Sequence, residues 1–354
     1  MKAGKIRVVV TEDSVFTRQL LVRILESDPG IEVVGVAKNG REAVEQVREL
    51  KPDLVTMDIR MPVMDGFQAT QTIMSERPTP ILVISSSVSS EDLETSFNAI
   101  QAGALDIVEK PRGSLRSDYR EIGAEIIRRV KMISEIRVFR HLSPRLQRKA
   151  AWSAGRGIPS SVEKAVAIGA STGGPSALYR LLKEVPENFP APIFVTQHIF
   201  EGFGEGCAGW LARNSPLTVK IAEEGEQITG GVVYFAPDRG LLEMVNRKRI
   251  TLRSPGPSEG RLNIDAMMKS VAAAFGSMSI AVLLTGMGSD GVEGLLRVKA
   301  AGGSTVVQDE KTSVIFGMPK AAIEAGAADR VLPLESIMPA VLNLLAAGGG
   351  KGKQ

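Results

Sequence analysis

The sequence predicts two α/β domains in tandem, each built on a mostly parallel sheet. Three observations support this fold class. At 354 residues the chain is too long for one ordinary hydrophobic core and suits two domains. Short apolar runs of strand character alternate with segments of helical spacing in both halves. Between the halves, residues 153–164 (SAGRGIPSSVEK) are rich in Gly, Ser and Pro, which is typical of a linker.

The composition excludes several other classes of protein. Hydrophobic residues make up 44% of the chain and charged residues 23%, as in ordinary globular proteins. No apolar run approaches the ~20 residues that span a bilayer, so we expect no membrane insertion. The first residues, MKAGKIRVVVTED, reach an acidic cluster after three valines, so we expect no signal peptide. The single cysteine, Cys207, cannot form an internal disulfide, which fits a cytoplasmic location.

The middle of the chain is basic. Residues 112–164 hold 13 Lys and Arg against 5 Asp and Glu, although the net charge of the whole chain is only +3. Such a stretch could bind nucleic acid or acidic lipid, or it could be a solvated linker that faces acidic surfaces. We favour the linker and expect no nucleic-acid partner, because the segment has few aromatic residues and no base-reading module. His141 lies in this segment, and we interpret it as an exposed residue of a helix.

The N-terminal half alternates strand and helix five times. Apolar runs predict strands over residues 6–10, 31–37, 53–58, 80–85 and 104–110. Helical spacing predicts helices over residues 14–27, 41–50, 67–77 and 93–103, and a fifth that begins near Tyr119. This order predicts a five-stranded, doubly wound parallel sheet, in which functional groups gather at the carboxyl ends of the strands.

Four of these five strands end in polar residues, namely Glu12-Asp13, Asp58, Ser85-Ser86 and Lys110-Pro111. Three carboxylates at one edge repel each other unless a cation lies among them, and oxygen ligands without Cys or His suggest Mg²⁺. A lysine and a hydroxyl at the same edge would contact an anion placed on Asp58. Polar residues are also ordinary at the ends of strands, but this set together favours a functional site.

Residues 6–125 resemble the receiver domain of response regulators, which is flavodoxin-like. The matching segments are VVVTEDS, TMDIRMPVMDGF, PILVISS and AGALDIVEKP. The resemblance implies that Asp58 accepts a phosphoryl group from a histidine kinase, and that Ser85 and Lys110 contact the phosphoryl oxygens. The phosphoryl group adds a charge of about −1.5 to −2, and Ser85 and Lys110 can move to contact it. The resemblance also implies a cis peptide bond between Lys110 and Pro111.

The same resemblance implies an Mg²⁺ site that serves phosphorylation. Asp13, Asp58 and the backbone carbonyl of Arg60 would bind the ion, and Glu12 would act through a water molecule. Two positions depart from the usual pattern, because Glu12 stands where Asp is more common and Ile107 where an aromatic residue is frequent. The first could alter the affinity for the metal, and the second argues against a switch read out by an aromatic ring.

The C-terminal half alternates in the same way. Strands are predicted over residues 166–170, 193–198, 232–237, 279–286 and 304–309, with a hairpin over residues 241–253. Helices are predicted over residues 175–182, 264–275, 294–302 and 319–326. We therefore expect a second α/β domain whose sheet is mostly parallel.

The turn GASTGGP, residues 169–175, allows two interpretations. The first is a phosphate-binding loop, but the turn lacks the lysine of a P-loop and the G-x-G-x-x-G of dinucleotide sites. Only the backbone amides of a helix N-terminus would then be available to bind phosphate. As a nucleophile elbow it fits G-x-S-x-G, in which small neighbours tolerate a strained backbone and expose the hydroxyl of Ser171. The second interpretation needs a base and a group that orients the base.

His198 and Asp290 could supply those groups. The chain has only two histidines, and His198 ends the strand that follows the turn, while Asp290 lies in LTGMGSDG after another strand. His198 could instead be a core histidine, and Asp290 could cap the helix that begins near Gly291 as well as orient a base. Cys207 has no catalytic motif around it and is not favoured as a nucleophile.

The order Ser…His…Asp, with the segments GASTGGP, TQH, LTGMGSDG and QDEKTSVIFGMPKAAI, resembles the chemotaxis protein-glutamate methylesterase (CheB) family. The resemblance implies a Rossmann-like catalytic domain that hydrolyses methyl esters of receptor glutamates, releases methanol and deamidates selected glutamines. Ser171 would be the nucleophile, His198 the base and then the acid, and Asp290 its orienting partner. Thr172 and the backbone amide of Met287 would support the oxyanion. No cofactor is implied for the esterase chemistry.

The resemblance divides the chain into a receiver domain over residues 6–125, a basic helical or flexible linker over 126–163, a catalytic domain over 164–347 and a disordered tail over 348–354. It also implies that the unphosphorylated receiver blocks the esterase and that phosphorylation relieves the block. The expected partners are a histidine kinase and methylated chemoreceptor helices, and we expect a monomer.

Three segments near the expected substrate cleft depart from the family pattern. They begin at Ile199, Asp238 and Arg261, where the family commonly has Met-Pro, His and His-Arg-Pro-Ser. These departures leave two alternatives open. The esterase half could have become a binding or signalling module, or it could hydrolyse a substrate outside chemotaxis.

Overall fold

The computed structural model describes residues 4–86, 90–111, 116–136, 138, 163–256, 259–260 and 262–347. The chain divides into two compact units, residues 1–147 and 148–354. His141, Arg261 and the predicted tail over residues 348–354 lie outside the described residues.

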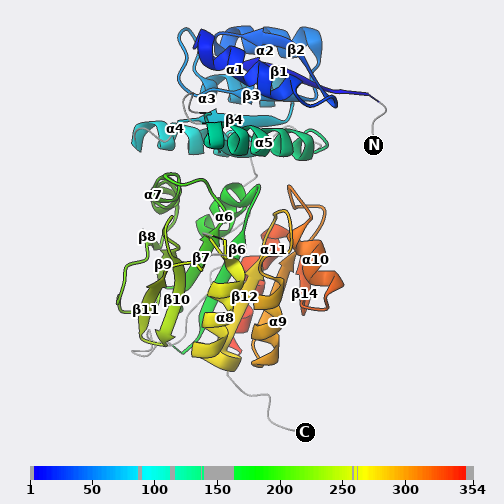
Figure 1. Cartoon of the computed structure of the whole chain (residues 1–354). Helices are drawn as coiled ribbons and strands as arrows, with labels where there is room; N and C mark the ends of the chain where they lie inside the picture. Colours follow the sequence, from blue (N-terminus) through cyan, green and yellow to red (C-terminus); the bar gives the residue numbers. More distant parts are fainter. Residues whose placement is uncertain are drawn as a thin grey trace. The chain divides into compact units, whose positions relative to one another are not determined.

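The N-terminal unit contains a five-stranded sheet in the order β2-β1-β3-β4-β5, and every neighbouring pair is parallel (Figure 1). Its strands are β1 (Ile6–Thr11), β2 (Ile31–Ala37), β3 (Leu54–Met57), β4 (Ile81–Ser85) and β5 (Asp106–Glu109). Because β1, β3 and β4 are neighbours, the residues that follow them share one edge of the sheet. The prediction of a five-stranded, doubly wound parallel sheet is confirmed.

Five helices accompany this sheet: α1 (Val15–Glu26), α2 (Gly40–Leu50), α3 (Gly66–Glu76), α4 (Ser90–Gln101) and α5 (Arg116–Ile133). The first three begin at capping side chains, since Ser14, Asn39 and Asp65 each accept a hydrogen bond from a backbone N–H of the first turn. Helix α1 contacts α5, and α3 contacts both α2 and α4.

Helix α5 continues past residue 125 to Ile133, and its apolar residues Ile126, Val130 and Ile133 are buried. The peptide bond between Lys110 and Pro111 is trans, so the expected cis bond was wrong. Trans is the form of lower energy even before proline.

The C-terminal unit contains a seven-stranded sheet in the order β14-β13-β12-β6-β7-β9-β8, again with only parallel pairs. Its strands are β6 (Ala165–Ala170), β7 (Ile193–Gln197), β8 (Thr218–Ile221), β9 (Val232–Phe235), β12 (Ser279–Leu283), β13 (Ser304–Gln308) and β14 (Arg330–Leu332). The hairpin is also present, as an antiparallel pair of β10 (Leu241–Asn246) and β11 (Arg249–Arg253). The first strand of the unit, β6, is thus central, with β12 and β7 on its two sides.

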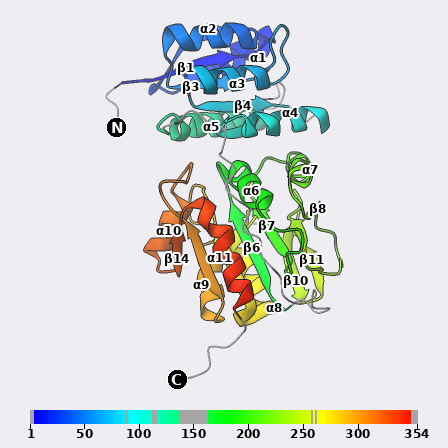
Figure 2. The ribbon, with the colours of Figure 1, turned by 180° about the vertical axis from the view of Figure 1, so that it is seen from behind.

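The α-helices that the structure describes beside this sheet are α6 (Gly174–Lys183), α7 (Gly204–Asn214), α8 (Ile264–Phe275), α9 (Val292–Ala300), α10 (Met318–Glu324) and α11 (Leu334–Ala346). Helices α8 and α9 pack together on the face that is in front in Figure 1, and α6 and α11 pack together on the face that is in front in Figure 2. Among the helices that the structure describes, none has the length and apolar content that crossing a membrane requires.

Candidate functional site

The six residues predicted at the N-terminal edge lie around one cavity of about 270 Å³. Its lining includes Glu12, Asp13, Asp58, Arg60, Ser85 and Lys110. They come from the ends of β1, β3, β4 and β5, as a parallel sheet with this strand order requires. The structure therefore brings together every side chain that the sequence assigned to a phosphoryl and metal site.

Lys110 joins two of the carboxylates. Its Nζ lies 2.8 Å from Asp58 Oδ1 and 2.9 Å from Glu12 Oε2. Burial, with a smaller contribution from Asp58, raises the pKa of Glu12 to about 7. Burial also raises the pKa of Asp58, although Lys110 opposes this effect. Burial lowers the pKa of Lys110, but the two carboxylates outweigh it and leave that pKa raised.

The acidic residues at this edge fit a hard divalent cation. Oxygen atoms of Glu12, Asp13 and Asp58 lie within 4.8 Å of one another. Asp58 Oδ2 is buried and accepts no hydrogen bond from the residues that the structure describes, which leaves it free to bind a ligand. Carboxylate oxygens without nitrogen or sulfur are the donor set that suits Mg²⁺.

Two further side chains hold this site, and the sequence analysis missed both. Arg18 Nη1 in α1 donates to the carbonyls of Glu12 at 2.6 Å and Asp13 at 2.9 Å, which fixes the acidic turn. Ser96 in α4 donates its hydroxyl to Ser85 Oγ at 2.8 Å. An arginine one turn into the helix after an acidic pair is a signal that could have revealed Arg18.

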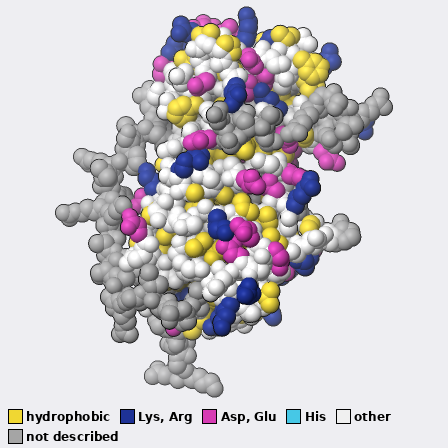
Figure 3. Space-filling model, turned by 90° about the vertical axis from the view of Figure 1, so that its left-hand side faces the viewer, with side chains coloured by type: hydrophobic (Ala, Val, Ile, Leu, Met, Phe, Trp, Pro, Cys, Tyr) yellow, Lys and Arg dark blue, Asp and Glu magenta, His cyan; other side chains and the backbone are white. Residues whose placement is uncertain are grey.

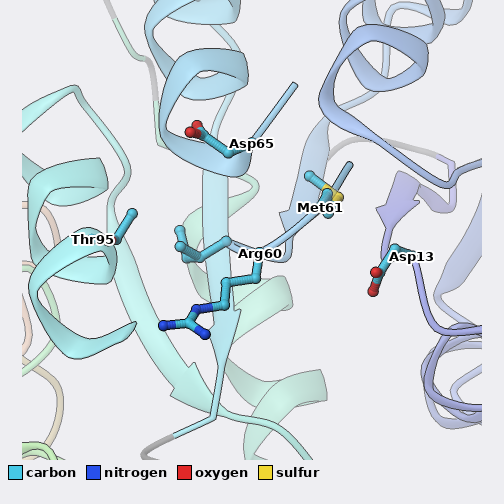
Figure 4. Close-up of a pocket in the computed structure, with 6 residues that line it drawn as sticks. Asp13, Arg60, Met61, Asp65 and Thr95 are labelled. Atoms are coloured by element: carbon cyan, nitrogen blue, oxygen red, sulfur yellow. The ribbon is translucent and has the colours of Figure 1, made fainter. Parts of the chain in front are cut away.

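A second cavity of about 450 Å³ adjoins the first and shares Asp13, Ile59 and Arg60 with it. Figure 4 shows Arg60 between Asp13 on one side and Thr95 of α4 on the other. Arg60 thus lines both cavities, close to the predicted phosphoacceptor.

In the C-terminal unit, three neighbouring strands deliver the predicted serine, histidine and aspartate to one edge. Ser171 follows β6, His198 follows β7 and Asp290 lies in the loop after β12. Backbone hydrogen bonds extend the sheet into these loops, because Ser171 N–H donates to Thr285 O at 3.0 Å and His198 N–H donates to Ala170 O at 2.9 Å. The nucleophile candidate therefore lies between the other two.

His198 and Asp290 are in direct contact, with 2.7 Å between His198 Nε2 and Asp290 Oδ2. Asp290 also accepts the backbone N–H groups of Ile264 and Asp265, each at 2.9 Å. Burial raises the pKa of Asp290, but the hydrogen bonds from His198 and these amides outweigh it and hold that pKa below its usual value. Asp290 therefore stays ionised and orients the imidazole.

The helix that Asp290 caps is α8, not the helix near Gly291. Its carboxylate binds the first amides of α8, while α9 begins at an uncapped Gly291 with φ of 96°. A second contact joins the two helices, because Asp265 Oδ1 in α8 accepts the N–H of Gly294 in α9. The alternative that Asp290 caps the helix near Gly291 does not hold, because the loop folds its side chain towards α8.

Ser171 is less exposed and less strained than the elbow motif suggested. The residue is only 6% exposed. Among the described residues, the non-glycine positions with positive φ are Lys51 and Val63, and the left-handed conformation in this turn falls on Gly173 at φ 77°. A glycine one position beyond Thr172 makes the sharp bend, so Ser171 need not. No hydrogen bond joins the Ser171 hydroxyl to His198 within the described part of the chain.

The two oxyanion candidates lie beside Ser171. Thr172 is 1% exposed, and its Oγ1 has no hydrogen-bond partner among the described residues. Met287 is 44% exposed and follows Gly286, where a Cβ atom would come within 2.6 Å of Ser171 Cβ. The loop that carries Met287 is therefore packed against the serine.

A buried network that the sequence analysis missed holds the serine turn from the side of β12. Thr285 Oγ1 donates to Thr172 O at 2.9 Å and accepts the N–H of Ile315 at 2.8 Å. The Thr285 N–H donates to Gln308 Oε1 at 2.8 Å. Thr285 and Gln308 are both fully buried. Polar side chains at the ends of apolar strands are the signal that could have revealed them.

Two of the departing segments contact each other. Asp238 Oδ2 accepts the N–H of Gly202 at 2.6 Å, and Arg239 forms an ion pair with Glu201. The loop after His198 is thereby tied to the loop after β9. Cys207 lies nearby in α7 and is fully buried, and burial raises the pKa of its thiol, which agrees with the expectation that it is no nucleophile.

The face of the molecule drawn in Figure 3 carries acidic and basic side chains in close mixture. Over the described residues of this face, side chains of like charge do not form a continuous patch.

Two family models match the chain. The model described as CheB methylesterase matches residues 166–341, and the model described as response regulator receiver domain matches residues 8–117. The chain is 42% identical over 353 residues to the protein-glutamate methylesterase/protein-glutamine glutaminase 4 of Myxococcus xanthus, covering 99% of this chain and 100% of that relative. A protein-glutamate methylesterase/protein-glutamine glutaminase of Nitrosospira multiformis is 42% identical over 351 residues, covering 97% and 98%.

A solved structure agrees with the C-terminal unit. The CheB methylesterase catalytic domain of Thermotoga maritima is 43% identical, covers 51% of this chain and 98% of its own, and has a TM-score of 0.50. Together, the relatives and this structure confirm the predicted fold class and family.

Proposed function

This chain belongs to the CheB methylesterase family, and on that premise we propose that it is a phosphorylation-activated serine hydrolase. It removes methyl esters from glutamate side chains of chemoreceptors, releases methanol and deamidates receptor glutamines in chemotaxis adaptation. The observation that carries the proposal is the His198–Asp290 contact at 2.7 Å, next to Ser171 at the edge of the sheet. An esterase half reduced to a binding module would have no need to keep this pair.

The proposed reaction uses Ser171 as the nucleophile. Ionised Asp290 accepts a hydrogen bond from the N–H at His198 Nε2, so the lone pair of the neutral imidazole lies on Nδ1. Nδ1 removes the proton of the Ser171 hydroxyl as Oγ attacks the ester carbonyl, and returns that proton to the departing methoxide. Water, deprotonated by the same nitrogen, then attacks the acyl-enzyme and releases glutamate. For a glutamine side chain the leaving group is ammonia.

The oxyanion formed in each step needs donors that are already in place. We assign this role to Thr172, whose Oγ1 is buried without a partner among the described residues, and to the Met287 amide. The hydrogen bond between Ser171 and His198 would form when substrate binds, because such bonds are often long in the free enzyme.

Phosphorylation would occur in the N-terminal unit. A carboxylate oxygen of Asp58 attacks the phosphorus of the kinase's phosphohistidine, the N–P bond breaks and the kinase histidine leaves, while Lys110 and Ser85 bind the phosphoryl oxygens. Asp13, Asp58 and the carbonyl of Arg60 would hold Mg²⁺, with Glu12 acting through water. When bound, the ion offsets the negative charge of the phosphoryl group. The supporting observations are the shared cavity and the free Asp58 Oδ2.

The proposed partners are a histidine kinase and methylated chemoreceptor helices, and the proposed state is a monomer. A cytoplasmic location remains a prediction from the single cysteine.

Methanol release from a methylated receptor tests the hydrolase proposal. Ser171→Ala should lower the rate by at least ~10³-fold, because it removes the only atom proposed to form the acyl-enzyme. Ser176→Ala makes the same substitution at a half-buried position of α6 and should leave the rate unchanged. Activity that survives in Ser171→Ala would show that another group is the nucleophile.

A further inference from the structure

Gln197, the last residue of β7, connects the nucleophile turn to the base. Its side-chain Nε2 donates to the carbonyl of Ser171 at 2.8 Å and to the carbonyl of His198 at 2.9 Å. The residue is only 2% exposed. One amide group therefore binds the backbones of both residues at once.

The chemistry of this position requires an amide. Both partners of Nε2 are carbonyl oxygens, which only accept, so the site needs a neutral group with two N–H donors. The other end of the amide, Oε1, lies against α6, where a Cβ atom at Gly174 would be only 1.9 Å away. Oε1 has no hydrogen-bond partner among the described residues. Strand β7 thus retains a buried amide that it leaves partly unsatisfied, which is unfavourable for stability.

We propose that Gln197 is a positioning residue, which holds the Ser171 turn and the His198 peptide at the separation that proton transfer needs. This inference rests on the proposed function. Gln197 touches neither reacting atom, and acts through the two carbonyls that it binds. The His198 N–H closes the link by donating to Ala170 O, directly before Ser171. Because Ser171 and His198 share no direct hydrogen bond within the described residues, this backbone link sets their relative position.

Gln197→Met is the first test, because methionine has a similar length and lacks both donors. We expect kcat for methanol release to fall about 10- to 100-fold, since small misplacements of reacting groups have effects of this size. The KM should change by less than about threefold, because Gln197 does not contact substrate. Activities are compared per folded molecule, measured by circular dichroism and thermal melting. A purely structural role would lower the melting temperature and leave kcat per folded molecule unchanged.

Gly174→Ala tests the same link without changing Gln197. Its new methyl group would displace the glutamine amide, so kcat should fall in the same way, although alanine favours the helix. Gly209→Ala is the matched control in α7, because the nearest atom to its Cβ is 3.8 Å away on a flexible arginine. Thr305→Val is a control for stability alone. It removes a buried hydrogen bond from β13 to Ala327 O, and β13 does not neighbour β6, so it should lower stability and leave kcat unchanged.

The outcomes separate this inference from the proposed function. If the native chain releases no methanol from methylated receptor, the proposed function is wrong and the inference falls with it. If the native chain is active and Gln197→Met keeps kcat within twofold, the inference alone is wrong. If Gln197→Met does not fold, Gly174→Ala decides by the same criterion. A fall in kcat with KM unchanged, beside unchanged controls, supports it.

Discussion

Asp290 accepts three hydrogen bonds, and they explain why its carboxylate is suited to orient His198. Two come from the backbone N–H groups at the start of α8, and the third comes from the His198 ring. The start of a helix favours a negative charge, so the carboxylate is held ionised and in one orientation. The start of α8 thus holds the carboxylate that contacts His198 Nε2.

Replacing Asp290 by Asn should reduce the esterase rate strongly. An amide presents one oxygen and one NH₂ where three donors now converge, so His198 would lose its tautomer and orientation. We expect kcat for methanol release to fall by about 10³- to 10⁴-fold. Asp329→Asn, in the same unit and outside the triad, should leave kcat unchanged. A loss of less than tenfold in Asp290→Asn would contradict the assigned role.

At the residue scale, the sequence predicted the candidate site residues that the structure brings together, but not the groups that hold them. Ser171, His198 and Asp290 follow strands, so strand ends and motif spacing were enough to select them. Gln197 and Thr285 act through hydrogen bonds to the backbone of neighbouring strands. Those contacts depend on which strands are adjacent, and a single sequence does not state this.

At the element scale, the strands and helices with clear periodicity were predicted within a few residues. Four elements of the C-terminal unit were missed: α7, α11, β8 and β14. Helix α7 (GEGCAGWLARN) has three glycines and depends on burying residues such as Trp210 and Leu211. Helix α11 contains Pro339 in its interior, which ordinarily ends a helix. Strands β8 and β14 are only four and three residues long, too short for an alternating pattern to stand out.

Asp329 contacts β13 and α9 near the edge of the C-terminal sheet, and these contacts make the stability of the protein depend on pH. Its Oδ2 accepts the N–H of Thr305 at 3.0 Å, and Lys299 lies 3.3 Å from Oδ1. Burial raises the pKa of Asp329, but these contacts outweigh it and leave the folded-state pKa below its usual value. A depressed folded-state pKa stabilises the protein above the unfolded-state value of about 3.9, and this contribution is lost as the pH falls through the folded-state value.

Asp329→Asn should therefore lower the free energy of unfolding at pH 7, by less than about 1 kcal/mol because solvent screens this exposed carboxylate. The difference from the native protein should persist down to about pH 5 and shrink below about pH 4. Urea unfolding followed by tryptophan fluorescence measures this, because both tryptophans, Trp152 and Trp210, belong to the C-terminal unit. A difference that stays constant from pH 7 to pH 3.5 would show that the carboxylate charge contributes nothing.

At the scale of the whole molecule, the two units share one arrangement. Each has a parallel sheet, and each gathers its reactive groups where neighbouring strands end. The alternation of elements predicted both sheets, and the polar ends of the strands predicted which residues meet at each edge. The order of seven strands in the C-terminal unit could not be predicted, because long-range pairing leaves no local pattern in the sequence.

We propose that phosphorylation of Asp58 controls hydrolysis at Ser171. The most direct test measures methanol release by the full chain in Mg²⁺, with and without acetyl phosphate. The native protein should be stimulated about 5- to 150-fold, the usual range for coupled sites, and Asp58→Asn should not respond. Asp53→Asn, at the opposite end of β3, should respond like the native protein. Equal rates with and without acetyl phosphate in the native chain, or stimulation that persists in Asp58→Asn, would contradict the claim.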